Sequence, residues 1–108
     1  MTGWCNVEPG TFLAELDNGT VGSDQIIDVR EPFEYEYYHL EPSVLIPLAE
    51  LPARLGELPE DKPLYIICAH GIRSVAACRY LAQQGFRDLR NVSGGMAAVA
   101  ALRGFAYD

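Results

Sequence analysis

Short runs of aliphatic and β-branched residues alternate along this chain with longer stretches of helical character. Residues 25–29 and 64–67 are the clearest apolar runs, and residues that favour turns bound them. Such runs predict buried strands. Residues 73–84 follow the second run with an apolar face at helical spacing, and Gly85 stops the pattern. Strands that alternate with helices favour an α/β fold with a mainly parallel sheet.

The weaker patterns extend the same alternation over the rest of the chain. A helix is expected to open at residues 9–11, with Thr11 as its cap, and to end at Asn18. Pro32 suits the first turn of an acidic and aromatic helix. Further strands are expected at residues 4–7 (an edge strand), 44–46 and 89–92, and further helices at residues 48–58 and 96–102.

Length and charge limit what the chain can be. Its 108 residues fit one domain, residues 1–108, that can bury a core without metals or disulfides. A net charge of −7 argues against a nucleic-acid-binding protein. The charge is uneven, because residues 1–61 sum to −11 and residues 62–108 to +4. No apolar run approaches the roughly 18 residues of a membrane span, so no membrane partner is expected.

Cysteine usage indicates the compartment. Cys5, Cys68 and Cys78 include no C-x-x-C pair, and the two histidines lie far apart in the sequence, so we expect neither a disulfide framework nor a metal site or other cofactor. Residues 1–6 lack the pattern of a signal peptide. Reduced thiols in the cytoplasm are therefore expected, with Cys78 in the core and Cys5 partly exposed.

The segment between the strand at residues 64–67 and the following helix carries the candidate chemistry. It reads Cys68-Ala69-His70-Gly71-Ile72-Arg73-Ser74. Ligands of parallel sheets bind beyond the carboxyl ends of strands, and a helix N-terminus favours an anion such as a thiolate. Gly71 lets successive N–H groups turn toward one anion, while Arg73 adds a cation and Ser74 a hydroxyl. The segment is a candidate anion site with Cys68 as nucleophile; the alternative is a buried cysteine before an ordinary turn.

Other polar residues have structural interpretations beside functional ones. Asp28 can hold the backbone of a loop at the end of its strand, and Arg30 can pair with Glu31 or Glu34. His70 can bind an anionic substrate or point into solvent. The glutamates at positions 34, 36 and 41, interleaved with tyrosines, predict a solvated helix face, with a partner surface as the alternative.

At this point the chain resembles the rhodanese-like family. Residues 27–31 with Glu34 resemble that family's D-V-R-E motif, and residues 68–74 resemble its active-site loop, C-x-x-G-x-R-S. His39-Leu40 with residues 46–48 resembles a third landmark, and residues 94–96 resemble its G-G-M turn. The resemblance runs from about Val7 to Gly104. The chain departs from the family pattern at Tyr38, where glycine is common, and at Val99, where tryptophan is common.

The resemblance implies a five-stranded, mainly parallel sheet with helices on both faces, and sulfurtransferase activity without a cofactor. Cys68 would take the outer sulfur of an anionic donor such as thiosulfate or a persulfide and carry it as a persulfide. A thiol, cyanide or a protein would accept the sulfur. The implied substrate-binding residues are Ala69, His70, Gly71, Ile72, Arg73 and Ser74, with Asp28 and Arg30 as structural support.

Two other functions remain open. The six residues from Cys68 to Arg73 match the loop length that the resemblance associates with sulfur chemistry. Phosphatase and arsenate-reductase relatives have a loop one residue longer, but an enzyme of that type is an alternative. A non-catalytic protein-interaction module that uses the acidic, tyrosine-rich surface is the other.

Overall fold

Five strands form one parallel sheet in the order β1-β5-β4-β2-β3. A computed structural model describes residues 3–108; Met1 and Thr2, part of the segment expected to lack a signal peptide, lie outside the described residues. The strands are β1 (Trp4–Val7), β2 (Ile26–Asp28), β3 (Val44–Leu45), β4 (Leu64–Ile67) and β5 (Leu89–Val92). The expected fold class is confirmed, with β1 at one edge of the sheet and β4 at its centre.

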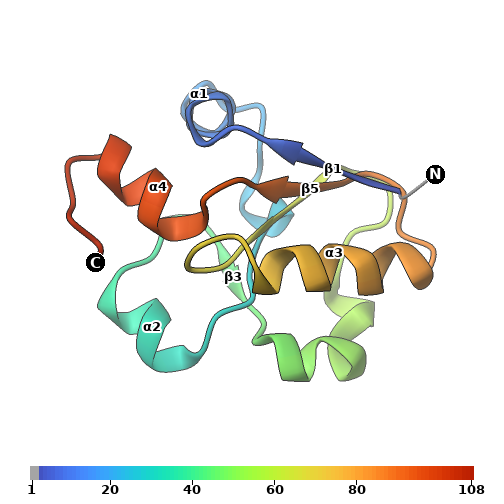
Figure 1. The fold of residues 1–108 in the computed structure, drawn as a ribbon. Helices are drawn as coiled ribbons and strands as arrows, with labels where there is room; N and C mark the ends of the chain where they lie inside the picture. Colours follow the sequence, from blue (N-terminus) through green and yellow to red (C-terminus); the bar gives the residue numbers. More distant parts are fainter. Residues whose placement is uncertain (1–2) are drawn as a thin grey trace.

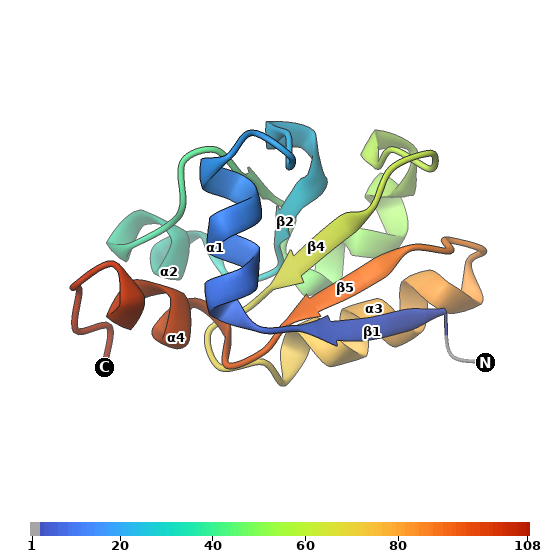
Figure 2. The same ribbon diagram turned by 90° about the horizontal axis from the view of Figure 1, so that it is seen from above.

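Helices cover both faces of the sheet. On one face lie α1 (Pro9–Asp17) and α4 (Gly95–Leu102), and on the other lie α3 (Arg73–Gln83) and the 3-10 helix η2 (Leu48–Glu57), as Figures 1 and 2 show. Helix α2 (Pro32–Tyr37) lies beside the C-terminal end of the chain (Figure 1), and η1 (Ser23–Gln25) precedes β2. No helix within residues 3–108 is long and apolar enough to cross a membrane.

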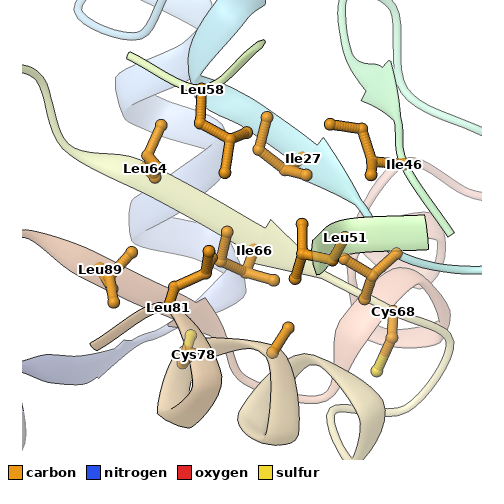
Figure 3. Close-up of a cluster of buried hydrophobic side chains, with 12 residues drawn as sticks. Ile27, Ile46, Leu51, Leu58, Leu64, Ile66, Cys68, Cys78, Leu81 and Leu89 are labelled. Carbon is orange, nitrogen blue, oxygen red and sulfur yellow. The ribbon is translucent and has the colours of Figure 1, made fainter. Parts of the chain in front are cut away.

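Strand β4 divides the core into two layers. Its side chains alternate between faces, so Leu64 and Ile66 join the cluster under α3 while Tyr65 and Ile67 join the cluster under α1 and α4. The same alternation places Cys68 in the α3 layer, at the end of the cluster drawn in Figure 3. The position of the candidate nucleophile is therefore fixed by the core itself.

One local prediction is wrong, and one predicted helix takes the 3-10 form. Helix α1 begins at Pro9, with Glu8 at its N-cap, and Thr11 lies inside the helix rather than capping it. The fixed φ of proline suits the first helical position, so the helix starts earlier than its apolar pattern. Residues 48–57 form a 3-10 helix with Pro52 inside it, and proline, which lacks an N–H, removes a bond that a regular α-helix needs there.

Candidate active site

Cys68 directly follows β4 and is buried, with 1% of its surface exposed. The backbone N–H of Gly71 donates to its sulfur with an N···Sγ distance of 3.1 Å. Gly71 has a φ of +96°, which only glycine adopts without strain, and a Cβ there would lie 3.3 Å from the backbone nitrogen of Gly94. The glycine thus makes the turn that aims a backbone donor at the candidate nucleophile.

A chain of hydrogen bonds leads from the buried sulfur across the sheet to the exposed Asn6. The Cys68 thiol donates to the hydroxyl of Ser74 over 3.2 Å, and that hydroxyl donates to the side-chain oxygen of Asn91 on β5. The Asn91 amide in turn donates to the Asn6 side chain on β1 over 2.9 Å. Ser74 has one hydroxyl proton, so it can turn from Asn91 to the sulfur once Cys68 has lost its own proton.

The N-terminus of α4 holds the other side of the loop. The N–H of Met96 donates to the carbonyl of Cys68 over 2.7 Å, and the N–H of Ala97 donates to that of Ala69 over 3.0 Å. A carbonyl and the N–H of the same trans peptide point in opposite directions. The loop's peptides therefore turn N–H groups away from α4, which is the orientation that anion binding by the loop requires.

Arg73 at the start of α3 is paired with Glu34 on α2. Its two terminal nitrogens donate to the two carboxylate oxygens, both over 2.8 Å, in a bidentate ion pair. The Glu34 side chain is 17% exposed and that of Arg73 is 36% exposed. Hydrogen bonds from Arg73 lower the pKa of Glu34 to about 2, against the opposing effect of burial. The cation expected to face an anion is therefore engaged by a carboxylate.

Asp28 and Arg30 form a buried pair below the loop. The Arg30 guanidinium and backbone N–H donate to the Asp28 carboxylate, with a closest contact of 2.7 Å, and both side chains are fully buried. The other guanidinium hydrogens reach the backbone carbonyls of Glu34 and Tyr38 and the hydroxyl of Tyr107. This network supports the expected structural role, but the predicted pairing of Arg30 with a glutamate side chain is wrong.

His70 and Ile72 form the outer part of the loop. His70 contacts the Asp108 carboxylate at 2.9 Å and the Tyr107 ring edge-on, while its side chain is still 55% exposed. Ile72 is 80% exposed and Ala69 is buried. His70 thus points into solvent, one of the two expected arrangements, and also has a partner within the chain that the sequence did not predict.

The other two cysteines differ from Cys68 as predicted. Cys78 lies fully buried in the α3 layer, where burial raises the pKa of its thiol to about 12. Cys5 on β1 is exposed. Both positions leave Cys68 as the thiol that lies at a loop and receives a backbone N–H.

The structure brings the expected loop residues 68–74 together with Asp28 and Arg30 at the carboxyl ends of β2 and β4. Sequence reasoning missed Glu34, Asn91, Tyr107 and Asp108 as neighbours of the site. The sequence holds one signal for the Glu34–Arg73 pair, which is the charge difference between the two parts of the chain. A net negative charge on residues 1–61 and a net positive charge on residues 62–108 favour ion pairs between the two parts.

Fold and site together define a parallel α/β domain with a cysteine loop at the carboxyl end of its central strand. Comparison with known proteins specifies the group further. The family model described as rhodanese-like domain matches residues 8–102. The chain therefore belongs to the rhodanese-like domain family.

Individual relatives agree with this assignment. A thiosulfate sulfurtransferase, GlpE, of Pseudomonas syringae is 35% identical over 95 residues, which are 88% of this chain and 86% of that protein. A putative sulfur carrier protein, YrkF, of Bacillus subtilis is 47% identical over 79 residues, which are 70% of this chain and only 43% of the carrier. A rhodanese-related protein from Thermoplasma volcanium shares 31% sequence identity with this chain. Its crystal structure matches this fold with a TM-score of 0.78, and the match covers 93% of each chain.

Proposed function

We propose that this protein is a sulfurtransferase that carries sulfane sulfur on Cys68. The observation that carries the proposal is the Gly71 N–H aimed at the Cys68 sulfur over 3.1 Å. A donor placed there stabilises the thiolate and, after transfer, the charge of the attached sulfur. The similarity to a thiosulfate sulfurtransferase and to a putative sulfur carrier protein supports the same reaction.

The reaction divides into two displacements. In the first, the Cys68 thiolate attacks the outer sulfur of an anionic donor such as thiosulfate or a persulfide. The new Sγ–S bond forms while the S–S bond of the donor breaks, and the rest of the donor leaves with the electron pair. In the second, a thiol, cyanide or a protein nucleophile attacks the terminal sulfur and releases the Cys68 thiolate, so ping-pong kinetics are expected.

The loop residues have distinct roles in this scheme. The N–H groups of residues 69–74 stabilise the negative charge of the terminal sulfur. The Ser74 hydroxyl donates a hydrogen bond to the Cys68 thiolate. Asp28 and Arg30 fix the backbone below the loop. The unpaired state of the three cysteines supports a reducing compartment such as the cytoplasm.

Intact mass spectrometry tests the proposal. The wild type, incubated with thiosulfate or a small organic persulfide, is expected to gain about 32 Da, the mass of one sulfur atom, as a covalent intermediate. The adduct should vanish in Cys68→Ser and persist in Cys5→Ser, and a thiol should remove it. A wild type that forms no adduct with any donor, while it hydrolyses an aryl phosphate, would establish the phosphatase alternative instead.

A further inference from the structure

Both basic side chains of the loop are paired with carboxylates from outside it. Glu34 on α2 engages Arg73 through two bonds of 2.8 Å. Asp108 engages the His70 imidazole at 2.9 Å. These carboxylates come from segments that lie 39 and 38 residues away from their partners in the sequence. Arg73, the permanent cation of the loop, is therefore already paired with a carboxylate before a donor binds, and the His70 imidazole also has a carboxylate partner.

Another cation that acts on Glu34 is Arg30, which lies inside the protein rather than in the loop. Residues 68–74 contain no lysine and no second arginine. Arg30, the neighbouring cation, is fully buried and donates to Asp28 and to the hydroxyl of Tyr107. A second negative charge on a sulfur donor would thus meet carboxylates without a free guanidinium to balance it.

We propose that Glu34 is a specificity-determining residue that favours sulfane-sulfur donors with one negative charge, organic thiosulfonates and hydropersulfides, over the thiosulfate dianion. The inference rests on the proposed sulfur transfer through Cys68. By holding Arg73 in a bidentate pair, Glu34 keeps the guanidinium from the sulfonate group that a thiosulfate ion carries. A donor with a single charge on its outer sulfur needs only the loop N–H groups.

The surface beside the ion pair suits a donor with an organic substituent. Ile72, the chain neighbour of Arg73, is 80% exposed, and Phe33, the neighbour of Glu34, is 73% exposed. The ion pair therefore joins two segments that each present a large exposed hydrophobic side chain. Apolar surface at this place favours an organic group over a strongly hydrated sulfonate.

Two donors that differ by one charge test the proposal. Thiosulfate and methanethiosulfonate both carry an outer sulfur on a sulfonyl group, but the first is a dianion and the second a monoanion. In each case Cys68 takes the outer sulfur, the S–S bond breaks, and sulfite or methanesulfinate leaves with the electron pair. The measured quantity is the second-order rate constant of persulfide formation on Cys68, followed by mass spectrometry, with each donor.

Glu34→Gln is expected to raise the thiosulfate rate constant more than the methanethiosulfonate rate constant, so that their ratio rises about fivefold. Glutamine retains an oxygen for the backbone N–H of Glu31, to which Glu34 now bonds over 2.9 Å, so the start of α2 is kept. The control is Glu36→Gln, the same change of charge at an exposed position of the same helix, and it should leave the ratio unchanged.

Glu34→Asp distinguishes an effect of the negative charge at position 34 from an effect of the size of the side chain. It keeps the carboxylate, and the ratio is expected to stay near the wild-type value. The proposal is overturned if Glu34→Asp raises the ratio as much as Glu34→Gln does, or if Glu34→Gln changes it no more than Glu36→Gln. Failure of the proposed function is a different result, because then neither donor places sulfur on Cys68 in any variant.

Discussion

A Cβ atom on Gly95 would lie 2.6 Å from the carbonyl oxygen of Cys68. Gly95 has a φ of +63° and is the first residue of α4, whose next N–H, that of Met96, bonds to the same carbonyl. The close approach of two backbones, one before and one after β5, is what holds the cysteine loop against α4. Glycine is required here both for its φ and for its missing side chain.

Gly95→Ala is therefore expected to lower the free energy of unfolding by more than about 2 kcal/mol, because a strained φ is combined with a backbone clash. Urea denaturation measures the loss, and sulfur loading of Cys68 should fall with it. Gly85→Ala is the matched control, since Gly85 has a φ of +98° but nothing within 4 Å of the added Cβ. Its cost should be only about 1 kcal/mol, with normal loading. Equal costs in the two variants would show that the clash is absent.

Ser74→Ala tests the hydrogen-bond chain from the nucleophile. Ser74 is fully buried and bonds to both Cys68 and Asn91. The variant is expected to lower the alkylation rate of Cys68 at pH 7 about tenfold, because the thiolate loses a donor worth about 1.5–3 kcal/mol. Iodoacetamide labelling read by peptide mass spectrometry measures this rate, with Ser23→Ala on η1 as an exposed control. An unchanged rate would remove Ser74 from the activation of Cys68.

Tyr107→Phe tests whether the C-terminal residues stabilise the network below the loop. The Tyr107 hydroxyl accepts a bond of 2.9 Å from Arg30, whose side chain is fully buried. Its removal leaves a guanidinium N–H without that partner, and the free energy of unfolding should fall by about 1–2 kcal/mol. Tyr80→Phe on α3 makes the same chemical change away from this network and should cost less than about 0.5 kcal/mol. If both variants unfold at the same urea concentration, the Arg30 bond contributes nothing measurable.

The main elements of the fold could be predicted because they depend on local patterns. The apolar run of β4 and the face of α3 with Cys78 and Leu81 follow directly from residue spacing, and the loop between them follows from Gly71. The cap of α1 was missed because Pro9 starts the helix before its apolar pattern begins. A local error of this kind does not change the predicted fold class, because that prediction depends on the alternation of strands and helices along the whole chain.

The ion pairs around the cysteine loop could not be predicted as well as the fold. Glu34 was expected on a solvated helix face, and its exposed surroundings on α2 fit that interpretation. Its pairing with Arg73 depends on how the fold brings α2 to the start of α3, which no spacing within either segment encodes. Asp28 differs from Glu34, because its carboxylate accepts the backbone N–H of Arg30 in the loop after β2, as a carboxylate at the end of a strand is expected to do. The additional bonds from the buried Arg30 guanidinium to Asp28 were not predicted.

The pH dependence of stability isolates the Glu34–Arg73 pair. The pKa of Glu34 is about 2 in the folded protein against an ordinary value of 4.5, chiefly through hydrogen bonds from Arg73. The unfolded chain therefore binds a proton in this range that the folded chain does not, and the stabilisation present above pH 4.5 is lost as the pH falls toward 2. Glu34→Gln cannot titrate, so its free energy of unfolding should fall less between pH 5 and pH 3 than that of the wild type. Urea titrations at both pH values measure the difference, and Glu36→Gln should behave as the wild type does. Equal losses in Glu34→Gln and wild type would mean that the ion pair does not persist in solution.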